Sequence, residues 1–401
     1  MKETESALKT RLIINGTSLS EPGTMGGNTK IVVEAIRHLG RDYDVHVVLP
    51  EGKMKTVEDA VPERDRATLH PFPAFPKSEF RHPVACVRHY LRAIRPVLDA
   101  LGAGSGDFFL SASDFHGDAF TSFLLQKRYG FRWLPSAFLF VPSPLENVRR
   151  GYGFPLPTYA LAWLYARVFL RFATRRATAF VITNTDDFRH FPKRFRERLL
   201  FPFYGGVNVD QIPSGPVPKT RDVVFCSRLC AQKGIMGFLD VWKLVHDRLP
   251  SARFTVIGNG APEFERALKE KAGRLGIADS IDWLGYVNNE AKYEIYRSAR
   301  VMVHPTVFDN NGMVAAEALC SGLPVAMYDL PPLRHVYTTG CAKVPFGDKA
   351  AFAEEVVCLL SDDAHYADVA PSPGEMDELR AFWDWPDRVA KFRAWLESLP
   401  R

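Results

Sequence analysis

The chain has 401 residues, 46% of them hydrophobic, which is ample for a buried core and favours two domains of about 200 residues each. A formal net charge of +5 gives no reason to expect a nucleic-acid partner. The six cysteines include no CxxC pair and no Cys/His cluster, and the polar N-terminus has no apolar signal core. We therefore expect reduced thiols in a cytoplasmic protein without a transmembrane helix.

The N-terminal half reads as strands that alternate with helices. Residues 11–15 predict a first strand, and a glycine-rich loop and a helix at 28–39 lead to a second strand at 45–49. This order is a βαβ unit, which belongs to a parallel sheet with helices on its faces. The proline-rich segment 51–83 is expected to be an irregular excursion. Further strands are predicted at 108–111, 133–141 and 179–183.

The same rhythm restarts after a linker at 210–221. Its strands are predicted at 223–226, 254–257, 281–284, 301–303 and 324–327. The pattern predicts an α/β protein with two Rossmann-like, doubly wound domains, 1–208 and 209–383, and a closing helix within 384–401. Ligands of such sheets bind beyond the carboxyl ends of the strands, and the cleft between the domains is the expected site.

The stretch His304–Tyr328 joins a strand end to a polar loop and then to a helix from about Met313. Free N–H groups at a helix N-terminus attract an anion, and Gly312 lets the backbone approach a ligand closely. Asp309 lies in the loop, and Glu317, about two turns into the helix, is placed to accept hydrogen bonds from hydroxyls. A phosphate with a polyol fits this pattern, so a sugar nucleotide is expected; the alternative is a solvated loop and an ordinary amphipathic helix.

Two cations, Arg228 and Lys233, lie on the loop between a predicted strand and the next helix. A planar guanidinium and a compact ammonium suit a diphosphate whose charge grows as it leaves, although solvated surface cations are the alternative. Gly258 follows another strand, without the third glycine and the acidic residue of a dinucleotide fingerprint. We expect Gly258 to shape the cleft wall beside a nucleotide.

The N-terminal half offers two weaker candidates. Gly26 and Gly27 in the first βα loop are expected to let backbone approach a donor sugar or an acceptor, unless the loop is simply flexible. Asp114, His116 and Asp118 follow a predicted strand. They are candidate acid/base or acceptor-positioning groups, and the alternative is that they cap a helix.

Together these motifs resemble those of retaining glycosyltransferases of the GT-B fold, glycosyltransferase family 4 (the group 1 transferases). The family's Glu-x7-Glu string stands here as residues 309–318, and its G-R-L-x-x-x-K-G as 227–234. Residues 206–208 resemble the N-G-V-D that ends the family's first domain, and 383–385 the F-S-W before its closing helix. The likeness covers 180–400 well and the N-terminal half in outline.

The resemblance implies a role for each matched residue. Glu317 is expected to bind the nucleotide ribose, Asp309 to hold hydroxyls of the donor sugar, and Arg228 with Lys233 to neutralise the departing diphosphate. The neighbouring residues expected at the donor are Asn310, Asn311, Gly312, Met313 and Val314.

The chain departs from the family pattern in three places. Asp309 is a shorter arm than the family's first Glu, and Asn310-Asn311 replace Gly-Phe. The family's histidine at the end of an N-domain strand has no counterpart in 137–140. Either His116 from a neighbouring loop replaces it or the donor is unusual.

The leading hypothesis is a retaining, metal-independent glycosyltransferase that uses a UDP- or GDP-sugar and a glycan, glycolipid precursor or small-molecule acceptor. No essential metal is predicted, because the only Asp-x-Asp, at 42–44, precedes its strand. Two alternatives stay open: a catalytically weak sugar-nucleotide-binding partner subunit and a GT-B-fold sugar-nucleotide epimerase.

The arginine-rich helix predicted over 159–176 has a separate interpretation. It favours a lipid-linked acceptor, or peripheral contact with an anionic membrane. The alternative is a core-packed amphipathic helix with a solvated basic edge.

Overall fold

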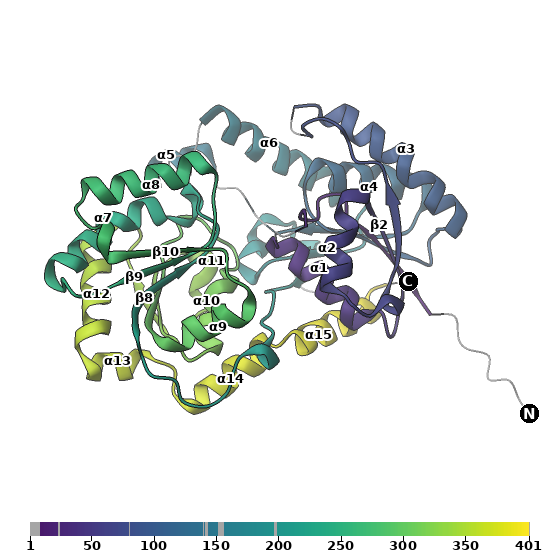
Figure 1. Ribbon diagram of the computed structural model, residues 1–401. Helices are drawn as coiled ribbons and strands as arrows, with labels where there is room; N and C mark the ends of the chain where they lie inside the picture. The colour runs from purple at the N-terminus through teal and green to yellow at the C-terminus, as the bar shows by residue number, and fades with distance from the viewer. Residues whose placement is uncertain are drawn as a thin grey trace, which may run out of the picture. The chain divides into compact units, whose positions relative to one another are not determined.

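The protein is described by a computed structural model that covers residues 9–22, 25–79, 81–138, 140, 143–150, 156–195 and 199–400. These residues form two compact units (Figure 1). Unit 1 lies within 1–144, 155–205 and 388–401, and unit 2 within 145–154 and 206–387. Each unit has its own parallel sheet, of seven strands in unit 1 and six in unit 2. The predicted α/β class with two doubly wound domains is confirmed.

Unit 1 has the strand order β3-β2-β1-β4-β5-β6-β7. Its central strands are mostly apolar, as expected for a parallel sheet covered on both faces; Leu12, Ile13 and Ile14 are fully buried. The strands are β1 (Arg11–Asn15), β2 (Asp44–Pro50), β3 (Thr68–Phe72), β4 (Phe108–Ser111), β5 (Arg132–Ala137), β6 (Phe180–Ile182) and β7 (Leu200–Pro202). The helices that begin in this unit are α1 (Gly27–Leu39), α2 (Met54–Ala60), α3 (Pro83–Leu101), α4 (His116–Tyr129), α5 (Pro144–Arg150) and α6 (Leu156–Ala173).

The prediction of an irregular excursion over 51–83 is wrong. The segment contains α2 and β3, and α3 begins at its end. β3 is the edge strand of the sheet, so Pro71, which has no N–H, takes no hydrogen bond away from a further strand. The prolines of this segment mark the edge of the sheet instead of interrupting the fold.

Unit 2 has the strand order β10-β9-β8-β11-β12-β13. Its strands are β8 (Arg221–Cys226), β9 (Phe254–Ile257), β10 (Ile281–Gly285), β11 (Ala299–His304), β12 (Val325–Tyr328) and β13 (Cys341–Val344). Its helices are α7 (Ile235–Arg248), α8 (Pro262–Arg274), α9 (Asn289–Ser298), α10 (Met313–Cys320), α11 (Pro331–Arg334), α12 (Lys349–Ser361), α13 (Asp363–Val369) and α14 (Pro373–Trp383). The sequence predicted all of these strands except β13, which is short and contains Lys343.

Both sheets reverse their strand order at one point, between β1 and β4 in unit 1 and between β8 and β11 in unit 2. Loops diverge at such a reversal, and ligands of doubly wound sheets bind at the carboxyl ends of the strands there. The residues that follow Asn15, Ser111, Cys226 and His304 are therefore the ones to examine for a site.

The last helix, α15 (Trp385–Ser398), ends the described chain, and from Arg388 onward it belongs to unit 1. Phe392 packs against Phe201 and Phe203, with ring centroids 5.2 Å apart in both pairs. The predicted return of the C-terminal helix to the first domain is thereby confirmed. Arg393 adds an ion pair with Asp42 at 2.6 Å.

The two segments that resemble family motifs at the domain junction meet in the structure. Val207 forms a β-bridge with Asp384, and its N–H donates to the carbonyl of Trp383 at 2.7 Å. A Cβ on Gly206 would lie 2.6 Å from the buried ring of Trp385, so only glycine fits there.

Candidate functional site

The strand reversal of unit 2 places a buried carboxylate, Asp309, between a lysine and a turn of backbone. Its Oδ2 accepts a hydrogen bond from Nζ of Lys233 at 2.6 Å. Its Oδ1 accepts from the N–H groups of Asn310, Asn311 and Gly312 at 2.9, 3.2 and 3.2 Å. Lys233 ends a short 3-10 turn after β8, 76 residues away in sequence. Both carboxylate oxygens thus have protein donors.

These contacts decide the charge of Asp309. Burial alone would raise its pKa, but the Lys233 ammonium, the neighbouring His304 and the hydrogen bonds hold the pKa far below its usual range. His304 ends β11, with its Nε2 3.8 Å from Oδ2 of Asp309. Burial, helped by the Lys233 charge and opposed by that of Asp309, lowers the pKa of His304 to about 4. Near neutral pH Asp309 is therefore ionised and His304 is neutral.

Gly312 fixes the entry to α10. Its φ of 63° is left-handed, and a Cβ there would lie 3.2 Å from Nε2 of His304. The hydroxyl of Tyr337 donates to the carbonyls of Asn311 and Gly312 at 2.7 and 2.8 Å. The first N–H groups of a helix have no partner within it, so those of Met313 and Val314 lie at the start of α10 without an intrahelical acceptor.

Glu317, on α10, has a cation of its own. Nζ of Lys292, a buried residue of α9, lies 2.8 Å from its Oε2. Burial by itself would lower the pKa of Lys292, but the Glu317 charge raises it, so the pair is ionic. The sequence analysis did not find Lys292. Lys292 could have been recognised from its spacing of three and four residues from Ile295 and Tyr296, which places this charged residue on the buried side of α9.

Two further predicted site residues of unit 2 are Arg228 and Gly258. Arg228 is exposed on the loop after β8 and has no ion-pair partner in the described chain. Gly258 has a φ of 129°, and a Cβ there would lie 1.9 Å from the carbonyl oxygen of Ser227, so it keeps the loops after β8 and β9 in close contact. The structure thus shows Lys233 already bound to a carboxylate and Arg228 open to solvent.

The strand reversal of unit 1 carries a second buried carboxylate, Asp118, in the first turn of α4. It accepts hydrogen bonds from the hydroxyls of Thr17 and Ser18, after β1, and of Ser113 at 2.7 Å, after β4. Burial raises the pKa of Asp118 to about 6 against the lowering effect of the three hydroxyls and of Lys53. The sequence analysis proposed Asp118 but not the hydroxyls.

The other candidates of unit 1 lie on the same edge of its sheet. Asp114 is half-buried, and burial raises its pKa to about 6. His116 is the first residue of α4, and its side chain lies outside the described part of the structure. Gly26 precedes α1 and donates its N–H to Oγ of Ser20 at 2.9 Å, and Gly27 is the first residue of that helix.

Two features of the described residues bear on partners. They contain no group of three or more His, Cys, Asp or Glu side chains arranged to hold a metal ion. Of the helices described, none has the length and apolar character needed to cross a membrane.

Comparison with known proteins agrees with this geometry. Residues 220–362 match the sequence model of the family described as glycosyl transferases group 1. A phosphatidyl-myo-inositol mannosyltransferase of Mycobacterium leprae is 34% identical over 167 residues. That match covers 39% of this chain and 43% of the relative, so the chain spans less than half of the relative's length.

Solved structures match nearly the whole chain. Sucrose-phosphate synthase from Thermosynechococcus elongatus superimposes with a TM-score of 0.77 over 97% of this chain and 99% of its own, at 15% identity. Anabaena HepE in complex with UDP and glucose gives a TM-score of 0.71 over 97% and 100%, at 14% identity. Identities this low show the fold alone. The chain has the GT-B fold, and residues 220–362 match the model of the group 1 glycosyltransferase family.

Proposed function

We propose that the chain is a retaining, metal-independent glycosyltransferase that moves a sugar from a UDP- or GDP-sugar to an acceptor. The observation that carries the proposal is the arrangement at the strand reversal of unit 2. Two carboxylates, Asp309 and Glu317, each bound to a buried or half-buried lysine, flank the N-terminus of α10. Few functions other than binding a phosphate and hydroxyl groups together explain this combination.

The leaving group determines the chemistry. When the bond from the sugar to the diphosphate breaks, negative charge grows on the diphosphate oxygens, and fixed cations that meet this charge lower the barrier. Arg228, open to solvent, and Lys233 are the cations placed for this. Protein cations then supply the stabilisation for which other transferases use a metal, which is why we propose no essential metal.

Asp309 enters this scheme through an exchange of partners. Both of its oxygens already accept protein donors, and Oδ2 is the one bound to Lys233, the cation placed for the diphosphate. When Lys233 turns to the diphosphate, Oδ2 of Asp309 becomes available to the donor sugar while Oδ1 stays on the backbone. Donor binding would thus couple charge neutralisation to sugar recognition.

Glu317 is proposed to bind the ribose hydroxyls, with Lys292 holding its carboxylate in place. The nucleotide is proposed to be a uridine diphosphate first, because HepE, whose fold the chain shares, is seen with UDP and glucose. A guanosine diphosphate is the second candidate.

The acceptor is proposed to bind unit 1, near Asp114, His116 and Asp118. The loops after β1 and β4 meet there, as they do in nucleotide-binding sheets at the strand reversal. A lipid-linked acceptor is one option, since the mannosyltransferase relative is named for a phosphatidyl-inositol. Glycans and small molecules are the others.

Thermal-shift screening of the full chain against UDP-, GDP-, ADP- and TDP-sugars tests the donor, followed by transfer assays with and without a chelator. Glu317→Ala is expected to weaken donor binding strongly, and Lys233→Ala to lower turnover mainly. Full activity in both variants would show that the site is misassigned. The anomeric configuration of the product, read by NMR, tests retention.

A second candidate is a sugar-nucleotide-binding partner subunit, favoured by the absence of a histidine from 137–140. Saturable nucleotide binding without hydrolysis or transfer would select it. A third outcome, a changed sugar nucleotide formed without any acceptor, would select an epimerase.

A further inference from the structure

Helix α6 exposes a row of large apolar side chains. Leu161, Leu164, Val168 and Phe172 are 68%, 53%, 39% and 41% exposed. Their spacing of three, four and four residues places them on one stripe of the helix. An exposed stripe of this kind on a surface helix marks a site where something else packs.

The opposite side of the same helix is already packed. Phe169 and Leu170 are buried in the core of unit 1, and the ring of Phe169 lies 5.7 Å from that of Phe120 on α4. Packing against the core therefore explains one face of α6. The stripe stays largely exposed, although the ring of Phe172 also lies 6.3 Å from that of Phe123 on α4. A solvated basic edge alone does not account for four exposed apolar side chains.

Arginines follow the stripe along one edge. Arg167 and Arg171 lie on α6 and Arg175 lies in the turn that follows it, at intervals of four residues. None of them forms an ion pair with a carboxylate of the described chain. The helix from Leu156 to Ala173 contains no acidic residue at all. The stripe is thus bordered by positive charge that nothing in the described protein neutralises.

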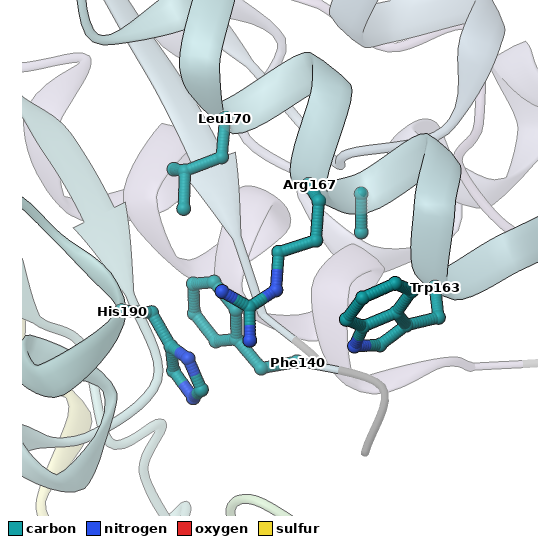
Figure 2. A pocket seen from close by; sticks show the side chains of 6 residues that line it. Phe140, Trp163, Arg167, Leu170 and His190 are labelled. Atoms are coloured by element: carbon teal, nitrogen blue, oxygen red, sulfur yellow. The ribbon is translucent and has the colours of Figure 1, made fainter. Parts of the chain in front are cut away.

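One of these arginines also lines a pocket. The pocket is lined by Arg167 together with Phe140, Trp163, Ala166, Leu170 and His190. Figure 2 shows the Arg167 guanidinium between the ring of Trp163, 5.3 Å away, and those of Phe140 and His190, which stack at 4.3 Å. The Arg167 guanidinium therefore lies among aromatic rings of unit 1, next to the stripe.

We propose that α6 docks on an anionic lipid surface, with the stripe Leu161, Leu164, Val168 and Phe172 in the acyl boundary and the arginines on the headgroup phosphates. An interfacial helix combines an apolar stripe with lysines or arginines beside it, as here. A second copy of this chain is a poorer occupant, because it would bring a second set of unneutralised arginines and no carboxylate. The inference extends the proposed transfer reaction but does not depend on it, since docking is measured without any sugar.

The test is co-sedimentation of the full chain with vesicles of phosphatidylcholine, with and without phosphatidylglycerol. We expect binding only to the anionic vesicles, and weaker binding as salt rises. Arg167→Gln/Arg171→Gln/Arg175→Gln should lower the partition coefficient about a hundredfold, since each arginine near an anionic surface contributes about a factor of five. Leu164→Ser/Phe172→Ser should lower it about tenfold or more.

A matched control removes the same charge from unit 2. Arg266→Gln/Lys269→Gln/Arg274→Gln changes three exposed cations of α8 and should leave vesicle binding unchanged. Far-UV circular dichroism and thermal melts verify that every variant folds. Absence of binding to anionic vesicles, or equal losses in the α6 and α8 variants, would overturn the proposal. Self-association that Leu164→Ser abolishes, without vesicle binding, would also overturn it in favour of a second copy.

Discussion

Asp309 in unit 2 and Asp118 in unit 1 are buried carboxylates at equivalent places, each following a strand at the reversal of its sheet. Asp309 has a lysine at 2.6 Å and three backbone N–H groups, and its pKa is held far below the usual range. Asp118 has three hydroxyls and no ion pair in the described chain, and burial raises its pKa to about 6. Burial is common to both, so the partners decide the charge.

The difference matters for function. A carboxylate that stays ionised can hold a cation ready for a diphosphate, as Asp309 holds Lys233. A carboxyl that titrates near pH 6 can exchange a proton under ordinary conditions, which suits a group beside an acceptor hydroxyl. The two halves of the fold thus offer a fixed charge on one side and a titratable group on the other.

Removing Lys233 should reduce the difference in charge between Asp309 and Asp118. In Lys233→Met, Asp309 loses its cation inside the protein, and breaking a buried pair costs about 3 kcal/mol or more of unfolding free energy. Sugar transfer should fall at least about a hundredfold with it. Urea titration and turnover measure the two effects. Lys243→Met, which breaks the solvent-exposed pair with Asp247, is the control and should cost less than about 1 kcal/mol.

The pH dependence of stability has opposite signs at the two carboxyls. Asp118 keeps its proton up to a pKa of about 6 in the folded chain, whereas the unfolded chain loses it near 4. It therefore makes stability fall by about 3 kcal/mol in all as pH rises from about 3 to 7, most of it between pH 4 and 6. Asp309, with its lowered pKa, contributes stability that is present above pH 4 and lost as pH falls below it.

Asp118→Asn isolates the first of these effects. Urea titrations between pH 4 and 7 should show a shallower decline in this variant than in the parent chain. Some decline should persist, because burial also raises the pKa of Asp114 to about 6. An unchanged pH profile would mean that Asp118 is ionised throughout and that the contrast with Asp309 is absent.

The Lys292→Met variant tests whether Glu317 depends on a neighbouring cation for stability in the way that Asp309 does. Glu317 keeps partial access to water, with 17% of its side chain exposed, so the loss should be smaller, about 2 kcal/mol of unfolding free energy. Donor affinity, measured by calorimetry, should fall about tenfold if the carboxylate loses its orientation. Lys271→Met, on the surface pair with Asp240, should leave donor affinity as it was.

The smallest expected effect concerns the backbone that surrounds Asp309. Gly312→Ala places a Cβ 3.2 Å from His304 in a left-handed residue, and Gly130→Ala places one in a similar conformation with no neighbour within 4 Å. The left-handed conformation alone costs about 1 kcal/mol in each. Thermal melts should show a greater loss for Gly312→Ala. Equal losses of stability in the two variants would mean that the loop before α10 adjusts to the added Cβ and that its N–H groups are not held rigidly.

The sequence predicted the parts of this molecule that local patterns determine. Apolar runs such as 11–15 and 223–226 became strands, and the loop before α10 became the centre of the site. It did not predict β3, because a proline such as Pro71 normally interrupts a strand. Pro71 is tolerated here because β3 lies at the edge of the sheet. No local pattern reports whether a strand is central or peripheral.

The partners of the site residues could not be found in the same way. Lys233 and Asp309 are 76 residues apart, and Lys292 and Glu317 are 25 apart. Each pair forms only because two loops or helices meet at the carboxyl edge of the sheet. A motif identifies one member of such a pair, and the fold supplies the other.

The bridge between Val207 and Asp384 has a consequence for how the chain can be cut. Apart from 145–154, unit 2 is the single segment 206–387, and the bridge holds the two ends of this segment side by side. It is therefore an insertion whose ends already meet, the arrangement in which circular permutation and transplantation succeed. A fragment close to 206–387 could be excised, or rejoined with new termini in a distant loop, without reaching across the molecule. Residues 206–387 can in this sense be moved as one module.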